Sequence, residues 1–215
     1  MFIMLALFAC LVGVLSILLV AEALWRGGHL RYEDHRKFVH IGVGIFVAFW
    51  PWIIGWHWIE LLGLAMAFVV LVDRQIRVFH FSVRLNRQTY GDILFALAIT
   101  ACALLANNKI IFALAILNLS VADGVAAIIG NHFGRHFRYK VFGQTKSVIG
   151  SMAFWLGSML ILGIGLLFFQ VNPHHYLWML LFLPPTLTWL ENFAVYGTDN
   201  LAVSLAVVAT LRLIN

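Results

Sequence analysis

Charged side chains are scarce in this chain. Only 11% of its 215 residues are Asp, Glu, Lys or Arg, whereas 63% are hydrophobic and the mean hydropathy is +0.95. A soluble domain carries about a quarter charged residues, so this chain has too few polar side chains to cover a surface exposed to water. The composition therefore excludes a soluble globular protein and predicts an integral membrane protein that crosses the bilayer several times.

Cysteine is also rare, and its placement excludes two further classes. Cys10 and Cys102 lie in separate apolar runs, which argues against a disulfide framework and against a cysteine metal site. The basic segments lack interleaved aromatic side chains, so we expect no nucleic-acid partner. The first apolar run, residues 2–25, exceeds the about 7–15 residues of a signal-peptide core, and we expect it to remain as a membrane helix.

Long apolar segments are what the chain has in abundance. A membrane helix needs about 17–25 apolar residues. Such segments, some of them short, occupy residues 3–25, 36–50, 57–72, 92–106, 110–130, 148–169, 176–190 and 199–213. The pair Pro184-Pro185 interrupts the seventh segment, because proline breaks or kinks a helix. The sequence thus predicts an all-α bundle of seven to eight membrane helices, forming one domain over residues 1–215.

Basic residues fall on alternate loops between these segments. Twelve of the 14 lie in the first, third and fifth loops: Arg26, Arg31, Arg36 and Lys37, then Arg74, Arg77, Arg84 and Arg87, then Arg135, Arg138, Lys140 and Lys146. Loops rich in Lys and Arg remain in the cytoplasm. We therefore expect the basic loops on the cytoplasmic face and both termini outside, with most carboxylates in or near the cytoplasmic half.

One carboxylate, Asp123, lies in the middle of an apolar run. A charged residue at the centre of a membrane helix costs about 2.5–3.5 kcal/mol, so a functional role is the default interpretation. A structural hydrogen bond to a neighbouring helix is the alternative. We expect Gly124 to loosen the helix or to let another backbone approach. Gly130 shares a helical face with Asp123, and Gly134 lies one further turn along. Packing between helices through small residues is the alternative for the glycines.

A second candidate is KSVIGS, from Lys146 to Ser151, which follows a basic loop and opens an apolar helix. A lysine, two hydroxyl groups and a glycine at a helix N-terminus suit a phosphate, because free backbone N–H groups and the helix dipole favour anions. A serine cap next to a cytoplasmic lysine is the alternative. The segment is not a P-loop, since G-x-x-x-x-G-K is absent.

The remaining candidates lie at the ends of other segments. ENFAVYGTDNL carries Glu191 and Asp199, oxygen ligands of the kind that suits Mg²⁺, although Asp199 also fits a helix cap. HRKFVHIG places Arg36 and His40 one helical turn apart, and packing is the alternative for the histidine. In YGD, Asp92 is explained most simply as a helix cap.

Taken together, these motifs resemble the integral-membrane polyprenol kinases, which include dolichol, phytol and farnesol kinases. RKFVH, YGD, ADG-x5-G-x3-G, KS-x2-GS and E-x7-DNL occur in the family's order between about residues 36 and 205. Dolichol kinases often have a glutamate where this chain has Ile149, so the resemblance favours the phytol and farnesol kinase branch.

The resemblance implies that the chain transfers phosphate from CTP to an isoprenoid alcohol, with a divalent cation such as Mg²⁺. It implies a nucleotide–metal site formed by Asp123, Lys146, Ser147, Gly150, Ser151, Glu191, Asp199 and Asn200, to which Gly130, Gly134, Arg36 and Lys37 contribute. Asp123 is then a metal ligand or the base for the alcohol. We expect this site at the cytoplasmic face, among membrane lipids, with homo-oligomers left open.

Two other functions fit parts of the pattern. A phosphatidate cytidylyltransferase is also a membrane enzyme that uses CTP. A transporter that relays protons or ions through Asp123 and Glu191 would account for the presence of these carboxylates. It leaves the clustered basic residues beside KSVIGS without a role.

Overall fold

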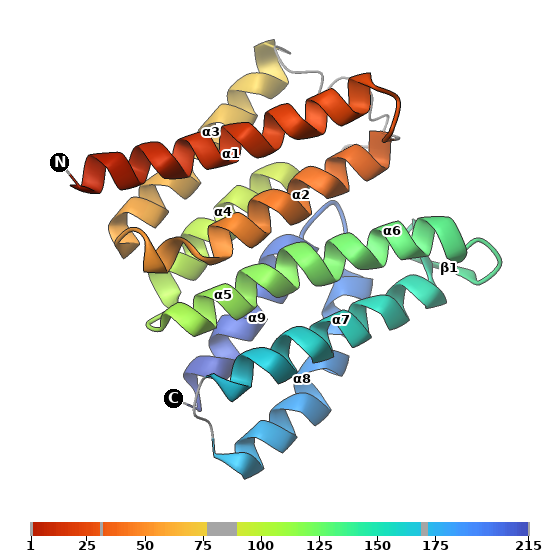
Figure 1. Cartoon of the computed structure of the whole chain (residues 1–215). Coiled ribbons are helices and arrows are strands. Elements are labelled where there is room, and N and C mark those ends of the chain that lie inside the picture. The colour runs from red at the N-terminus through yellow and green to blue at the C-terminus, as the bar shows by residue number, and fades with distance from the viewer. Residues whose placement is uncertain (1, 31, 77–89, 169–171, 215) are drawn as a thin grey trace.

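A computed structural model describes residues 2–30, 32–76, 90–168 and 172–214 of the chain (Figure 1). Its elements are α1 (Phe2–Arg26), α2 (Tyr32–Ala48), η1 (Trp50–Trp52), α3 (Trp56–Ile76), α4 (Gly91–Leu105), α5 (Lys109–Leu117), η2 (Asn118–Ala122), α6 (Asp123–Phe133), β1 (Arg138–Val141), β2 (Gln144–Ser147), α7 (Val148–Leu167), α8 (Pro173–Phe193) and α9 (Asp199–Arg212). Of the predicted third loop, Arg77, Arg84 and Arg87 lie outside the described residues.

Each of the eight predicted apolar segments is helical over most of its length, which confirms the helical class. Four helices are long and apolar enough to cross a membrane: residues 2–26, 56–73, 109–133 and 148–167. The count of seven to eight spans stays a prediction beyond these four. The pair Pro184-Pro185 lies inside α8, which nevertheless continues to Phe193.

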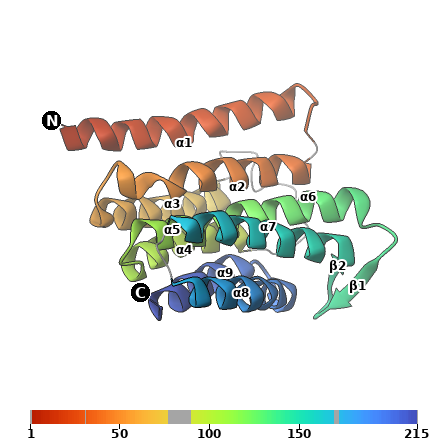
Figure 2. The same ribbon diagram turned by 60° about the horizontal axis from the view of Figure 1, so that its bottom comes forward.

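The continuous rod formed by α5, η2 and α6 is the centre of the bundle. In its most apolar window 72% of the residues are buried, against 11% for α1 and 17% for α7. Helices α2, α7 and α9 pack along this rod, whereas α1 lies at the outer edge and packs mainly on α2 (Figure 2). Both termini lie at the end of the molecule opposite the β1–β2 hairpin (Figures 1 and 2).

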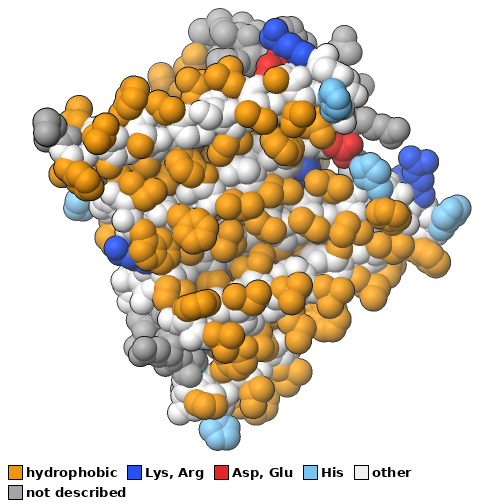
Figure 3. Space-filling model, viewed as in Figure 1, with side chains coloured by type: hydrophobic (Ala, Val, Ile, Leu, Met, Phe, Trp, Pro, Cys, Tyr) orange, Lys and Arg blue, Asp and Glu red, His pale blue; other side chains and the backbone are white. Residues whose placement is uncertain are grey.

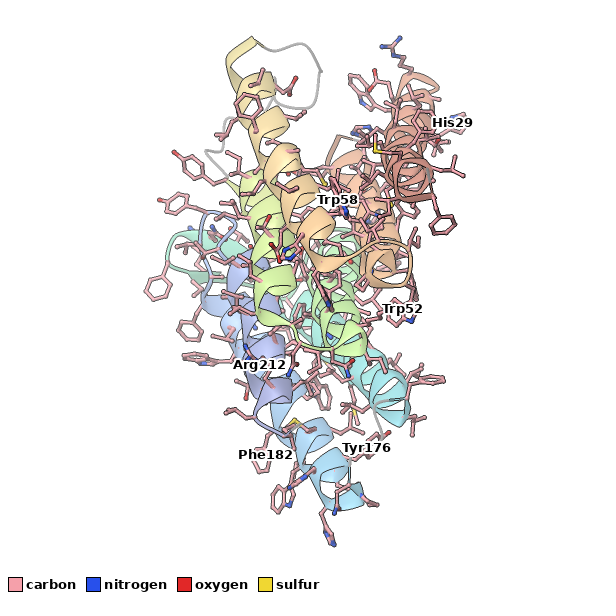
Figure 4. All side chains as sticks on the ribbon, turned by 90° about the vertical axis from the view of Figure 1, so that its left-hand side faces the viewer. His29, Trp52, Trp58, Tyr176, Phe182 and Arg212 are labelled. Atoms are coloured by element: carbon pink, nitrogen blue, oxygen red, sulfur yellow. The ribbon has the colours of Figure 1, made fainter. Side chains whose placement is uncertain are left out.

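The outer surface of the bundle is apolar, as helices facing lipid require. Side chains such as Trp52 and Phe182, 50% and 56% exposed, project outward from the bundle (Figure 4). In contrast, charged and histidine side chains gather mainly at one end, near the connection from α1 to α2 and the end of α6 (Figure 3). The polar groups of this chain are therefore concentrated at the end that also carries the hairpin.

The hairpin is a departure from the predicted all-α fold. Strands β1 and β2 pair in antiparallel register, with Tyr139 opposite Lys146. The turn is made by Phe142 and Gly143, both at positive φ, as a two-residue hairpin turn requires. Lys146 thus lies on a strand, and the prediction that it begins the helix is wrong. The helix starts at Val148 because Ser147 is its cap: the Ser147 hydroxyl accepts the N–H of Gly150 at 3.0 Å.

A second departure lies immediately before Asp123. Residues Asn118–Ala122 form a π-helical turn in the middle of the central rod. Such single turns are rare and occur frequently at functional sites, because the extra residue frees backbone groups and redirects side chains. One carbonyl of this turn, that of Leu119, accepts a hydrogen bond from His40 Nε2 at 3.1 Å.

Candidate active site

Three carboxylates from distant parts of the sequence meet at the polar end of the bundle. Asp123 begins α6, Glu191 lies in the last turn of α8, and Asp199 begins α9. Each places an oxygen so that the three oxygens lie within 4.8 Å of one another. Asp123 and Glu191 are both 7% exposed. Like charges this close in a buried place require cations to neutralise them.

The first cation is Lys37 from α2. Its Nζ donates to Asp123 Oδ2 at 2.6 Å, and both side chains are buried. His40 lies one turn further along α2, with Nε2 3.6 Å from the same oxygen. Because the Leu119 carbonyl can only accept, His40 Nε2 must carry the proton of their hydrogen bond.

Small residues bring α2 close enough for these contacts. A Cβ added to Gly44 would overlap Ser120 of the π-helical turn, and one added to Gly124 would overlap Ile41. The neighbour that Gly124 admits is therefore the Ile41 side chain, and the approach of another backbone at Gly124 stays a prediction. The α2 face that carries Lys37 and His40 is thereby held against Asp123.

The second cation is Lys146 from β2. Its Nζ forms an ion pair with the Glu191 carboxylate and also donates to the Glu191 backbone carbonyl at 2.9 Å. Burial disfavours the charged ammonium, but the Glu191 carboxylate, together with Asp199 and Asp123, raises the pKa of Lys146 above its usual range. Lys146 is therefore a fixed positive charge beside the three acids.

Asp199 is held differently from the other two acids. Its Oδ1 accepts the N–H of Asn200 at 3.0 Å, and within the described part of the chain it has no ion pair. Asn200 is turned toward α4, where its Nδ2 donates to the Gly91 carbonyl at 2.7 Å. Asp199 is therefore the acid with most need of an added cation.

A cavity of about 310 Å³ opens beside these groups. Its lining includes two cations, Arg36 and Lys37, and two acids, Asp123 and Asp199, and Lys37 and Asp123 are paired with each other. The remaining lining residues are His40, Gly91, Phe142, Gly143, Gln144, Tyr196, Gly197 and Asn200. A volume of this size lies at the lower end of the range for small-molecule sites, about 300–1,000 Å³. Carboxylates beside cations suit a polyanion together with a divalent cation.

Comparison with known proteins agrees with this chemistry. A phytol kinase of Synechocystis sp. is 31% identical to the chain over 202 residues, an alignment that covers 88% of this chain and 83% of the relative. The chain belongs to the polyprenol and phytol kinase family. No family model and no solved structure matches it. The resemblance expected from the ordered motifs is thus confirmed, and with it the prediction of a lipid kinase.

Most residues that the family resemblance assigned to one site fall into two groups in the structure. Those at the cavity or in the acidic cluster are Arg36, Lys37, Asp123, Lys146, Glu191, Asp199 and Asn200, and His40, a separate candidate, also lines the cavity. Gly130, Gly134, Ser147 and Gly150 lie instead in the contact between α6 and α7. A Cβ on Gly130 would be 2.7 Å from Ser147 Oγ and 3.2 Å from Gly150 Cα. These distances support helix packing for the glycines, and their part in nucleotide binding stays a prediction.

Two further predicted residues lie at the margin. Asp92 is the second residue of α4, whose cap residue is Tyr90, so the expectation that Asp92 caps the helix is wrong. An acid in the first turn still suits the helix dipole. Ser151 faces α8, where its hydroxyl donates to Asn192 Oδ1 at 2.8 Å. Neither residue lines the cavity.

Several residues at the cavity and beside the acidic cluster could not be identified from the sequence. Phe142, Gln144 and Tyr196 line the cavity. Tyr139 and Asn192 form a hydrogen bond of 2.6 Å next to Lys146 and Glu191. The alternating pattern on either side of Phe142-Gly143 is a usable hairpin signal. Tyr196 has a φ of 56°, which is unusual for a residue other than glycine. No sequence pattern predicts this backbone conformation.

Proposed function

We propose that this chain phosphorylates an isoprenoid alcohol, with CTP as the donor, at the cytoplasmic face of the membrane. One observation carries the proposal: Asp123, Glu191 and Asp199 meet in a buried cluster beside Lys37 and Lys146, in a chain of the phytol kinase family. The named activity of the relative supports an isoprenoid alcohol such as phytol, farnesol, geranylgeraniol or a longer polyprenol as the acceptor.

The donor set fits a divalent cation. Mg²⁺ prefers oxygen ligands and is usually held by one or two carboxylates together with substrate phosphates. Asp123, Glu191 and Asp199 provide such oxygens within 4.8 Å of one another, while Asn200 is the neighbouring amide. The bound cation would neutralise charge on the transferring phosphoryl group and its leaving group.

The cations at the cavity suit the nucleotide phosphates. Arg36 and Lys37 line it directly, and Lys146 stands behind the acids as a second fixed ammonium. Arg36 is anchored by Glu33 at 3.3 Å, and its Nε is buried with no protein partner in the described part of the chain. A phosphate oxygen would satisfy that donor. The exposed rings of Phe142 and Tyr196 at the rim provide stacking surface for the base.

The chemical step transfers one phosphoryl group. The alcohol oxygen forms a bond to the γ-phosphorus, the bond from that phosphorus to the β–γ bridging oxygen breaks, and the nucleoside diphosphate leaves. The alcohol proton passes to a carboxylate of the cluster, Asp123 or Asp199. Transfer of this kind depends mostly on positioning and on neutralising charge, which is what fixed lysines and buried acids provide.

The membrane face follows from the basic loops. The connection from α1 to α2 and the hairpin carry Lys and Arg, and they lie at the end that holds the cavity. Loops rich in these residues remain in the cytoplasm, where CTP is available. The opposite end carries both termini, which we place outside.

The test uses purified chain in detergent with CTP or ATP labelled at the γ-phosphate and isoprenoid alcohols of several lengths. A kinase moves the label into a lipid monophosphate, and the preferred donor and alcohol are those with the highest kcat/KM. Label released as pyrophosphate in the presence of phosphatidate would instead identify a cytidylyltransferase. Solute flux in proteoliposomes without nucleotide, and no labelled lipid, would overturn the proposal in favour of a transporter.

A further inference from the structure

A groove of about 570 Å³ runs along the outside of the bundle between α7 and α8. Among the residues that the structure describes, no charged one lines it. Its lining residues are Tyr139, Val148, Ser151, Met152, Trp155, Pro185 and Thr188. Val148, Met152 and Trp155 are 47%, 54% and 38% exposed, so the groove is open on the side that we place toward lipid. Its volume lies within the usual range for a small ligand, about 300–1,000 Å³.

One end of this groove is polar, through three side chains bonded to one another. Asn192 Oδ1 lies 2.6 Å from the Tyr139 hydroxyl and 2.8 Å from the Ser151 hydroxyl, and the two hydroxyl oxygens are 2.6 Å apart. The two hydroxyl protons can serve two of these three contacts at a time. All three side chains are neutral and half-buried. The groove therefore has the polarity of an amphiphile, apolar along its length and hydrogen-bonding at one end.

The polar end is next to the acidic cluster through two direct connections. Tyr139 and Lys146 are cross-strand partners, so their side chains stand on the same face of the hairpin. Tyr139 contacts Asn192, while Lys146 contacts the adjacent Glu191. The hairpin thus contacts two consecutive residues of α8: Asn192 at the polar end of the groove and Glu191 in the acidic cluster.

We propose that this groove holds the hydrocarbon chain of the isoprenoid alcohol, with its hydroxyl at Tyr139, Ser151 and Asn192 before transfer. The inference rests on the proposed kinase function and adds the location of the acceptor. Under it the two substrates approach through different openings beside the hairpin. The nucleotide enters from the cavity that Gln144 lines, and the alcohol enters from the α7–α8 groove.

The neutral polar end favours an alcohol over a phospholipid. A phosphate headgroup needs cations, and the ammonium nearest this end, that of Lys146, is paired with Glu191. Arg138 and Lys140 flank Tyr139 on β1, but alternate residues of a strand point to opposite faces. Hydroxyl and amide groups match a neutral O–H, which can both donate and accept a hydrogen bond.

The first test is photolabelling of the full chain in lipid nanodiscs with an isoprenoid alcohol that carries a diazirine in its chain. We expect adducts on the groove lining, at Met152 and Trp155, that excess phytol abolishes and excess phosphatidylglycerol leaves in place. Adducts spread over the lipid-facing helices, or displaced equally by phosphatidylglycerol, would overturn the inference, because the groove would then be an ordinary lipid contact.

The second test separates the acceptor from the donor. Met152→Trp fills the groove and should raise KM for the alcohol at least tenfold, with KM for the nucleotide unchanged; a single misplaced methylene in an apolar pocket costs about 10–200-fold. The matched control is Leu160→Trp, on an α7 residue that is 64% exposed and outside the groove. Equal KM values for both variants would overturn the inference.

A milder variant covers the case in which Met152→Trp fails to fold. Tyr139→Phe keeps the ring and removes only the hydroxyl. In the wild-type protein phytol should compete with the photolabel better than phytol methyl ether does, and in Tyr139→Phe the two should compete equally well. An unchanged preference would contradict the assigned hydroxyl site. If the wild-type protein phosphorylates phytol while the photolabel attaches elsewhere, only the assignment of the alcohol to the groove is wrong. If it phosphorylates no alcohol, the kinase proposal itself is wrong.

Discussion

Lys37 and Asp123 are 86 residues apart in the chain, yet their side chains form an ion pair of 2.6 Å. Both side chains are about nine-tenths buried. Burying one charge without its partner is costly, so the pair commits α2 and the central helix to a fixed relative position. The same contact leaves the second oxygen of Asp123 available for a cation.

The ion pair predicts different effects on stability and on activity. Asp123→Asn should lower kcat by about 10²–10³, the usual cost of removing one electrostatic contact to a transition state. It should also destabilise the protein, because breaking a buried pair from one side costs about 3–5 kcal/mol. Adding Lys37→Met should restore part of the lost Tm but none of the kcat. Tm in detergent and turnover of γ-labelled CTP measure the two effects.

The matched control for this prediction is Glu60→Gln. Glu60 lies on α3, outside the acidic cluster, where its carboxylate is 3.6 Å from the ring of His57. Its loss should leave kcat within about twofold, since surface ion pairs contribute about 0–1 kcal/mol. Full turnover by Asp123→Asn would reject the role assigned to Asp123.

A second prediction concerns Lys146, which bonds to both the carboxylate and the backbone carbonyl of Glu191. Lys146→Gln should raise KM for the nucleotide at least tenfold and lower kcat, because the acids lose a fixed neutralising charge. Lys140→Gln removes an exposed lysine from the opposite face of the same hairpin and should change neither value. Steady-state kinetics with CTP as the varied substrate measure both values. Similar KM values for the two variants would contradict the role assigned to Lys146.

The third prediction concerns the divalent cation. Mn²⁺, followed by its paramagnetic resonance, should bind the purified chain without nucleotide, and Asp199→Asn should weaken that binding at least tenfold, or about 1.4 kcal/mol. A chelator should remove turnover, and Mg²⁺ should restore it. Asp34→Asn is the control, an acid near His132 and outside the cluster. Equal Mn²⁺ affinities of the two variants would show that the cation binds elsewhere.

The fourth prediction concerns the contact between α6 and α7. Gly130→Ala places a methyl group 2.7 Å from Ser147 Oγ and 3.2 Å from Gly150 Cα, so we expect a loss of about 1–3 kcal/mol and a lower Tm. Gly55→Ala is the control, because a Cβ there meets no atom within 4 Å. If Gly130→Ala had the same Tm as the control, α6 and α7 could move apart to admit the methyl group without loss of stability, and the prediction would be wrong.

The eight helices could be predicted from the sequence because each depends on local composition. An apolar run long enough for lipid forms a helix to satisfy its own backbone, whatever its neighbours are. The importance of Asp123 could be predicted for the same reason, since a carboxylate in such a run is costly wherever the helix packs. The order of the motifs was enough to indicate the family that the comparison confirmed.

The hairpin and the π-helical turn could not be placed in this way. The segment RYKV-FG-QTKS is short and follows basic residues, so its sequence favours a loop that leads into a helix. The π-helical turn has no distinguishing composition, because its extra residue is stabilised by contacts such as His40 with the Leu119 carbonyl. Both features depend on partners that are remote in sequence.

The amino-acid sequence by itself determined the class, the helices and the list of residues able to do chemistry, because each is a property of a local stretch of chain. Only the tertiary structure decided which of those residues meet. Asp123, Glu191 and Asp199 converge beside Lys37 and Lys146, whereas Ser147, Gly150 and Gly130 pack two helices together. The reason is that convergence depends on how closely helices approach, which Gly44 and Gly124 set through contacts with other helices.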